Sequence, residues 1–163
     1  MTPPYDMRFN ETWAIRWKRR FVRWLTPANW PGTKETEPDR DDTRAYAAWL
    51  GRRGERYAEW WLRRHRGMIV LDRNFRHGHQ ELDIIARDGR VIVFVEVRTL
   101  TSDVLQAPAA TITPKKRENL HQAAKAWRDR RRYRGHWRMD VVGIVWPIAS
   151  PGPSRVDHWE KCL

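Results

Sequence analysis

The chain has 163 residues, 40% of them hydrophobic and 32% charged, which is enough for one folded domain with an appendage and excludes a disordered polymer. Its formal net charge of +12 predicts a polyanionic partner, first of all nucleic acid, with anionic lipid as a second candidate. No apolar run approaches the roughly 20 residues of a membrane-spanning helix, and the first residues lack the pattern of a secretory signal peptide.

Residues 10–25 are predicted to form a basic amphipathic helix. Aromatic residues recur there at helical spacing, at Trp13, Trp17, Phe21 and Trp24, with arginines and a lysine between them. Such a helix can dock on an anionic membrane, on RNA or on a protein, or its stripe can pack on the chain's own domain. The acidic segment 33–42 is expected to be a linker, so that residues 1–42 form an N-terminal extension.

Residues 43–147 carry the pattern of a mixed α/β layer domain. A helix over residues 43–65, capped by Asp41 or Asp42, is expected to stop at Gly67. The glycines inside it predict close approach of another backbone, or a helix that begins later. Three strands should follow, over residues 68–76 with a bend at Asn74, over 81–86 and over 91–98.

The rest of the chain predicts a second helix and further strands. After a loop over residues 99–112, Thr113 is a good N-cap and Pro114 suits the first helical position. A strand is expected over residues 138–146, and the tail 148–163 offers a short edge strand at 155–159. The single cysteine, Cys162, allows no disulfide within the chain, which indicates a reducing, cytoplasmic location.

Carboxylates in the apolar hairpin mark the candidate site. If Asp88 and Gly89 form a two-residue turn, Glu81 faces Glu96 and Asp83 faces Phe94. Strand alternation then gathers the acids and Arg98 on one face, and puts Leu82, Ile84 and the valines on the other. As diagonal neighbours, Asp83 and Glu96 could share one hard cation such as Mg²⁺, which suits phosphodiester cleavage; a solvated charge network is the alternative.

Six segments carry a family resemblance: "GRRGERYAEWWL", "RNFR", "ELDIIARDG", "VFVEVR", "TPKKRENLHQAA" and "RMDVVGI". In this order, over residues 51–146, they resemble the YraN-like family of bacterial proteins within the PD-(D/E)XK nuclease superfamily. The resemblance implies a restriction-endonuclease-like three-layer core, with a mixed central sheet flanked by helices. It does not extend over the N-terminal extension.

The resemblance also implies roles for individual residues. It implies that Asp83 and Glu96, joined by Glu55, bind Mg²⁺ or Mn²⁺, that Arg98 orients water and stabilises phosphate charge, and that Lys116 contacts the phosphate. Asp140 matches a family position and is expected to be structural.

Two positions depart from these patterns. Arg98 stands where the superfamily has lysine, and arginine cannot act as a general base because it stays protonated. Gln80 stands where a glycine is usual. Outside the pattern, His77 and His79 could ligate a metal, although a surface loop is the competing interpretation.

A basic stretch from Lys125 to Arg138, with aromatic residues between the arginines, suits contacts to a nucleic-acid backbone and to stacked bases, against a solvated helix end as the alternative. The residues expected to bind nucleic acid are Arg98, Lys115, Lys116, Arg131, Arg132 and Arg134. Two functions follow as hypotheses, with DNA favoured over RNA. One is a divalent-metal-dependent endonuclease, with branched or flap DNA among its expected substrates; the other is a non-catalytic nucleic-acid-binding protein on a nuclease-like fold.

Overall fold

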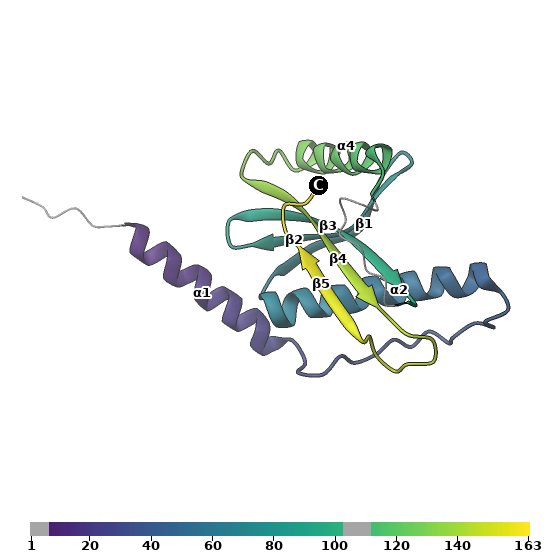
Figure 1. The fold of residues 1–163 in the computed structure, drawn as a ribbon. Helices are drawn as coiled ribbons and strands as arrows, with labels where there is room; N and C mark the ends of the chain where they lie inside the picture. Colours follow the sequence, from purple (N-terminus) through teal and green to yellow (C-terminus); the bar gives the residue numbers. More distant parts are fainter. Residues whose placement is uncertain (1–6, 103–111) are drawn as a thin grey trace, which may run out of the picture.

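A five-stranded mixed sheet lies between helices in three layers, which confirms the α/β class and the restriction-endonuclease-like core expected from the sequence (Figure 1). The computed structural model describes residues 7–102 and 112–163, and of residues 7–13 only the backbone. The part of the expected loop over residues 103–111, and the side chain of Trp13, therefore lie outside the described residues.

The sheet follows chain order from one edge to the other, with strands β1 Ile69–His77, β2 Gln80–Asp88, β3 Val91–Leu100, β4 Trp137–Val145 and β5 Arg155–Trp159. Neighbouring strands pair antiparallel except β3 and β4, which are parallel. A parallel pair needs a crossover connection, and helix α4 (Pro114–Arg130) lies within it. Strand β5 is the expected short edge strand.

Helices cover both faces of the sheet. Helix α2 (Thr43–Trp61) packs on one face through residues that include Leu50 and Ala58, and α4 packs on the other through Leu120 and Trp127. Their starts follow the capping rules, since Asp42 accepts a hydrogen bond from the Ala45 amide and Thr113 accepts one from the Lys116 amide. Both faces of the sheet are therefore occupied by core, and polar groups between the layers require a specific explanation.

The glycine signals in α2 are resolved by packing. A Cβ added at Gly54 would lie 1.8 Å from the Thr99 hydroxyl of β3, so this glycine permits close contact between helix and strand. Gly51 has nothing within 4 Å of such a Cβ and is not required by packing. Beyond α2 the chain continues as a π-helical turn, η1 (Leu62–Arg66), and stops at Gly67, which adopts the left-handed conformation with φ +67°.

The predicted register of the β2–β3 hairpin is wrong by two residues. Asp88 pairs with Val91, so the turn consists of Gly89 and Arg90 and not of Asp88 and Gly89. Gly89 has φ +62° at the first turn position, as a type II′ turn requires. The next step after the last pair, Ile84–Val95, therefore brings Asp83 opposite Glu96, where Phe94 was expected.

The predicted apolar face of β2 is also interrupted. Leu82 and Ile84 were expected on one face, but Leu82 packs in the α4-side core and Ile84 in the α2-side core. The neighbouring strand β1 bends at Asn74, as predicted, with φ +47°. The regular alternation of β2 therefore breaks at Asp83, between the two core residues.

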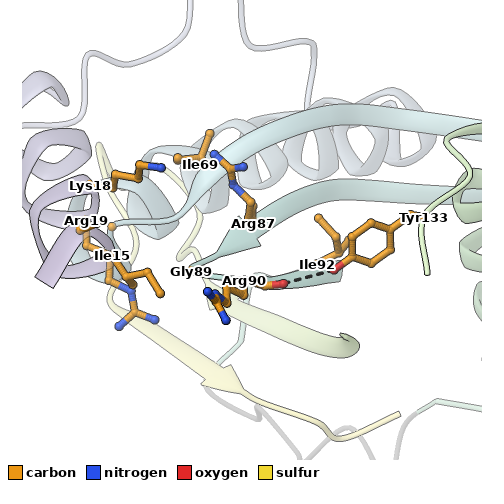
Figure 2. A pocket seen from close by; sticks show the side chains of 11 residues that line it. Ile15, Lys18, Arg19, Ile69, Arg87, Gly89, Arg90, Ile92 and Tyr133 are labelled. Carbon is orange, nitrogen blue, oxygen red and sulfur yellow. Dashed lines mark hydrogen bonds between the residues drawn. The ribbon is translucent and has the colours of Figure 1, made fainter. Parts of the chain in front are cut away.

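Helix α1 (Met7–Leu25) leaves the domain at one end and projects away from it (Figure 1). The side of α1 that faces the domain contacts it at Gly67 and at the β2–β3 turn. A cavity of about 440 Å³ lies beside these contacts (Figure 2). Trp17, Phe21 and Trp24 are 54%, 57% and 78% exposed, so the aromatic stripe does not pack on the domain, and that alternative is wrong. Among the described residues, no helix combines the length and apolar character needed to cross a membrane.

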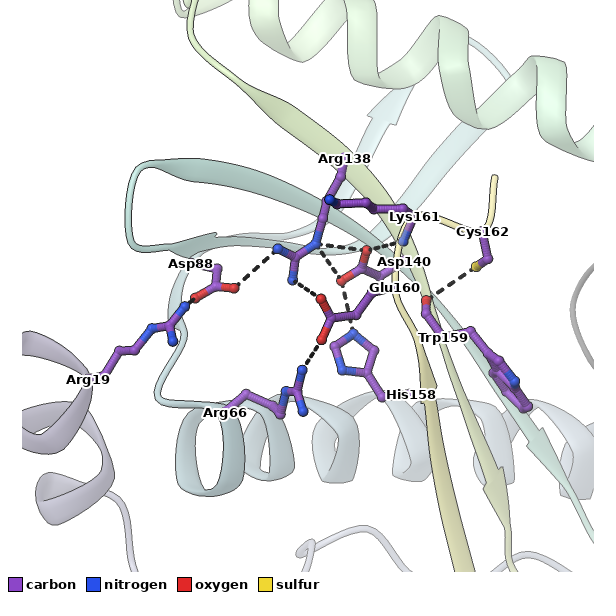
Figure 3. Close-up of polar contacts among 10 residues, drawn as sticks. All are labelled: Arg19, Arg66, Asp88, Arg138, Asp140, His158, Trp159, Glu160, Lys161 and Cys162. Atoms are coloured by element: carbon purple, nitrogen blue, oxygen red, sulfur yellow. Dashed lines mark hydrogen bonds and ion pairs between the residues drawn. The ribbon is translucent and has the colours of Figure 1, made fainter. Parts of the chain in front are cut away.

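A buried polar network ties β4 to the C-terminal segment (Figure 3). Asp140, fully buried, accepts hydrogen bonds from Arg138 at 3.0 and 3.1 Å and from the Lys161 amide, and its Oδ2 lies 2.9 Å from His158 Nε2. Arg138 also pairs with Asp88 of the β2–β3 hairpin. These contacts agree with the structural role expected for Asp140.

Candidate functional site

Strands β2 and β3 separate at Asp83 and Glu96, and we call this point the fork. Ladder pairing ends at Ile84, and the Asp83 side chain then bridges to β3: its Oδ2 accepts a hydrogen bond of 2.7 Å from the Val97 amide. Glu96 is 7% exposed and lies on the α4 side of β3. Two carboxylates from neighbouring inner strands therefore lie close together where the strands separate, between the two helical layers.

Lys116 joins the fork from the first turn of α4. Its Nζ lies 3.0 Å from Glu96 Oε2, and the lysine side chain is 37% exposed against 8% for the glutamate. The contact is an ion pair without hydrogen-bond geometry, so Glu96 Oε2 has no hydrogen-bond partner among the described residues. The lysine is placed by the Thr113 cap, because that cap fixes where α4 begins.

Glu55 approaches from the opposite layer, on α2. Its Oε2 accepts a hydrogen bond of 3.0 Å from the Asn74 amide group at the bend of β1. Glu55 and Asp83 line one groove with a volume of about 860 Å³, which we call the site groove. The two carboxylates thus face a common solvent-filled space, with α2 on one side and strands β1 and β2 on the other.

The electrostatics of the fork favour one bound proton or a cation. Burial, followed by the negative charges of Glu96 and Glu55, raises the pKa of Asp83 to about 7, and the Val97 amide and the Lys116 charge only partly oppose this. A carboxyl that resists ionisation at neutral pH beside two other carboxylates is a sign of uncompensated negative charge.

The donor set suits a hard divalent cation. Mg²⁺ takes oxygen ligands and is often held by one or two carboxylates together with water and substrate phosphate. The unsatisfied Oε2 of Glu96 and the crowded Asp83 provide such oxygens. In the described part of the chain, however, no three His, Cys, Asp or Glu residues form a ready ligand cluster, so two carboxylates would carry the cation. His77 and His79, which were expected as possible metal ligands, are exposed and belong to no such cluster.

Arg98, the superfamily's lysine position, lies on β3 two residues beyond Glu96 and is half-buried. Its Nε has no hydrogen-bond partner among the described residues. The only amino group that the described structure brings to Glu96 is that of Lys116, which comes from a helix and not from the strand. The expected glycine position, Gln80, bonds to Gln122 of α4.

The residues expected to bind nucleic acid separate into two groups. Lys115 and Lys116 stand at the start of α4, and Arg131, Arg132 and Arg134 at its end, about 22 Å away along a helix that rises 1.5 Å per residue. The distal arginines are exposed, although Arg131 pairs with Asp72 and Arg134 with Asp129. Trp127 is buried in the core and offers no ring to a base. Of the tryptophan and tyrosine rings in this stretch, only the half-buried Tyr133 and Trp137 keep an exposed part.

Sequence reasoning missed the arginines that surround the site groove, which are Arg52, Arg56, Arg73 and Arg76. Each pairs with a carboxylate: Glu35 binds both arginines of α2, Glu59 binds Arg73, and Glu81 binds Arg76. The spacing of Arg52 and Arg56 about Glu55 places all three on adjacent helix faces, and this signal could have found them. Glu35 comes from the linker, and no sequence pattern predicts its contact.

The mixed sheet between helices, with paired carboxylates where two strands separate, defines a restriction-endonuclease-like α/β protein. Residues 54–144 match the model of the uncharacterised protein family UPF0102, which is more than half of the chain. The chain belongs to this family.

Individual relatives agree with this assignment. A UPF0102 protein of Geobacter sulfurreducens is 42% identical over 110 residues, covering 67% of this chain and 84% of the relative. Another, of Anaeromyxobacter dehalogenans, is 38% identical over 126 residues, with 68% and 90% covered. A third, of Rhodopirellula baltica, is 38% identical over 119 residues, with 71% of each chain covered.

Proposed function

We propose that this protein is a divalent-metal-dependent endonuclease that hydrolyses phosphodiester bonds in DNA, with branched or flap structures as the favoured substrates. The observation that carries the proposal is the convergence of Asp83 and Glu96 at the fork, with Lys116 against Glu96 and Glu55 facing the same groove. Buried like charges are costly, and retention of such a cluster is best explained by a ligand that compensates it.

The roles follow from the placement of the groups. Asp83 and Glu96 would hold the cation, and Glu55, which lines the same groove as Asp83, adds negative charge beside it. When bound, Mg²⁺ or Mn²⁺ supplies an activated water and neutralises charge on the phosphate. Lys116 is placed to stabilise the negative charge that develops on the phosphate, and Arg98 is limited to a similar task because it stays protonated.

The substrate would approach over the site groove. Its arginines are held by carboxylates in the free protein, and a phosphate backbone would replace those partners. The exposed Lys115 and the arginines at the end of α4 extend the positive surface beyond the groove, at a separation that a duplex, but not a mononucleotide, spans. The proposed substrate is thus an extended polyanion.

The test is a panel of single-stranded, duplex, flap and four-way DNA, incubated with Mg²⁺ or Mn²⁺. Asp83→Asn and Glu96→Gln keep the shape of the fork and remove one charge each, so both should lower cleavage by a factor of about 10³ or more. Asp157→Asn, on the edge strand β5, is the matched control and should cleave normally. Absence of cleavage on every substrate, or cleavage by the two fork variants at the rate of the parent protein, contradicts the proposal.

A second candidate is non-catalytic binding of nucleic acid. The absence of a ready three-residue ligand cluster in the described part of the chain favours it, as does arginine at the strand position. This function predicts DNA binding that persists in a chelator and survives Asp83→Asn. For each phosphate contact, a tenfold rise in salt concentration should lower log K by about 0.9. Binding that required a divalent cation at Asp83 would exclude it.

A further inference from the structure

Helix α1 carries large apolar side chains that are more than half exposed. Its exposed residues, the α1 stripe, are Trp17, Phe21, Trp24 and Leu25. At about 100° per residue these four fall in one sector of the helix, on the side opposite the row that contacts the domain. The stripe contains no charged residue.

The direction of the stripe is fixed by close contacts on the inner side of α1. A Cβ added at Gly67 would lie 2.9 Å from the Arg19 carbonyl oxygen, and one added at Gly89 would lie 3.3 Å from the Ile15 side chain. Arg19 also pairs with Asp88 beside the turn (Figures 2 and 3). Because α1 cannot roll without losing these contacts, the stripe points away from the domain.

Arginines flank the stripe on one side and face a hollow. Arg16, Arg20 and Arg23 line a groove of about 520 Å³ between α1 and η1, whose other lining residues are Arg19, His65, Arg66, Asp88 and Glu160. The two acids already have partners, since Asp88 binds Arg19 and Arg138, and Glu160 binds Arg66 and Arg138. Among the described residues, no carboxylate pairs with Arg16, Arg20 or Arg23. The groove, which we call the α1 groove, therefore keeps a net positive charge.

We propose that α1 is an interfacial anchor that lies on an anionic lipid bilayer, with the α1 stripe in the headgroup region and lipid phosphates bound in the α1 groove. An interfacial helix has aromatic and aliphatic residues on one face and arginine beside it, and it lies in the plane of the membrane without crossing it. Tryptophan prefers this depth, and arginine side chains reach the phosphates from there.

The separation of the two kinds of residue favours lipid over nucleic acid. A nucleic-acid surface needs arginines and aromatic rings on the same face, because the backbone and the bases of one strand lie side by side. On α1 the rings face outward and the arginines face sideways, toward η1. The contact of Arg20 with the Trp17 ring, at 5.8 Å, lies at the border between the two faces.

This anchor would leave the candidate site free. Helix α1 meets the hairpin at its turn, and the fork lies about 17 Å farther along β2, at roughly 3.3 Å per residue. The inference does not depend on the proposed nuclease activity, since it concerns other residues and another ligand.

The test is flotation of the full chain with vesicles of phosphatidylcholine alone and with about one-third phosphatidylglycerol. The protein should float only with the anionic vesicles. The double variant Trp17→Ser/Trp24→Ser should weaken vesicle binding about tenfold or more. The double variant Arg20→Glu/Arg23→Glu should weaken it by at least roughly fivefold for each arginine lost. Ile148→Ser, which removes an equally exposed apolar side chain outside α1, and Arg134→Glu are the matched controls.

Three results would overturn the inference. The first is equal flotation with neutral vesicles or none with anionic ones. The second is binding that the tryptophan variant leaves unchanged, since the basic charge of the domain alone would then explain it. The third is that the tryptophan variant keeps its vesicle binding but loses affinity for DNA or RNA, or changes from dimer to monomer in sedimentation. The α1 stripe would then bind another partner.

Discussion

At the scale of a single residue, Asp83 makes a structural hydrogen bond in surroundings that disfavour its negative charge. Its side chain closes the gap between β2 and β3 through the Val97 amide, which is a structural task, while burial and two neighbouring carboxylates disfavour its charge. An asparagine could accept the same hydrogen bond without the charge. For stability alone, asparagine would therefore suit this position better than aspartate.

The first prediction concerns the stability of Asp83→Asn without metal. Because the folded pKa of Asp83 is raised to about 7, the folded protein holds a proton that the unfolded chain releases near pH 4, and stability falls as pH rises between these values. At pH 8 in a chelator, the variant should be more stable than the parent by roughly 1–3 kcal/mol, and at pH 4 the difference should vanish. Urea unfolding at both pH values measures this.

Metal addition gives the control for that prediction. Mn²⁺ at pH 8 should stabilise the parent protein and leave Asp83→Asn nearly unchanged, because only the ionised pair binds the cation. A variant that is less stable than the parent at pH 8 would show that the aspartate charge is compensated within the chain.

The second prediction separates two adjacent lysines. Lys116 contacts Glu96, whereas Lys115 is exposed and pairs with Glu118 at 3.7 Å. Under the proposed function, Lys116→Met should lower kcat about 10²- to 10³-fold, because it removes the positive charge that would stabilise the phosphate in the transition state. Lys115→Met should raise KM a few-fold through weaker backbone binding and leave kcat unchanged. Equal effects of the two variants on kcat would remove Lys116 from the site; circular dichroism checks that both fold.

At the scale of elements, the linker contacts α2 at the site groove. Glu35 binds Arg52 at 3.3 Å and Arg56 at 2.6 Å, and both arginines line the groove. Under the proposed function, a substrate phosphate would take the position of this carboxylate. The linker would then compete with the nucleic acid for the same guanidinium groups.

The third prediction follows from this competition. Glu35→Gln should tighten binding of duplex DNA about twofold to fivefold, since exposed ion pairs are worth roughly 0.2–1 kcal/mol. Glu37→Gln is the matched control, because Glu37 lies in the same linker and its ion-pair partner in the described structure is Arg40, also of the linker. Fluorescence anisotropy at fixed salt measures both, and weaker binding by Glu35→Gln would mean that Glu35 positions the arginines.

Elements with local signals were predicted well from the sequence. Thr113 and Pro114 specify the start of α4 by themselves, and Gly67 specifies the end of the first domain helix. The hairpin register was wrong because both candidate turns contain Gly89, and a shift of two residues leaves every side chain on its face. Periodicity therefore cannot distinguish the two registers.

Only part of the candidate site could be derived from the geometry of the sequence, and the reason is physical. Asp83 and Glu96 lie in adjacent strands, so strand geometry could bring them together, whereas Lys116 and Glu55 were reached only through the family resemblance. The break in β2 at Asp83 and the linker contact of Glu35 depend on tertiary packing, and no local pattern encodes them. The Asp140 position was recognised, but its partners His158 and Lys161 were not.

At the scale of the whole molecule, one polar network holds together elements from both ends of the chain. Arg19 of α1 binds Asp88, Asp88 binds Arg138 of β4, and Arg138 binds Glu160 near the C-terminus (Figure 3). Arg66 of η1 completes the connection by binding Glu160. The position of α1, and with it the direction of the α1 stripe, is thus coupled to the packing of the C-terminal segment.

Asp140 is the centre of this network, and its replacement is the last prediction. Asp140→Asn removes one of the three carboxylates that pair with Arg138, while Asp88 and Glu160 remain, and should lower the free energy of unfolding by roughly 1.5–3 kcal/mol, the contribution of hydrogen bonds to a charged group. Asp157→Asn, whose partner Arg155 is 54% exposed, should cost less than about 1 kcal/mol. Urea unfolding at neutral pH compares the two.

The pH dependence of this difference has the opposite sign to that of Asp83. Burial opposes ionisation of Asp140, but the hydrogen bonds from His158 and the Lys161 amide and the charge of Arg138 outweigh it, so the pKa is lowered. A lowered pKa contributes stability that is present above the unfolded value, near 3.9, and is lost as pH falls through the folded value. The gap between parent and Asp140→Asn should therefore shrink below about pH 4. If the difference in stability stays constant down to pH 3, the shape of Asp140, and not its charge, accounts for its contribution to the polar network.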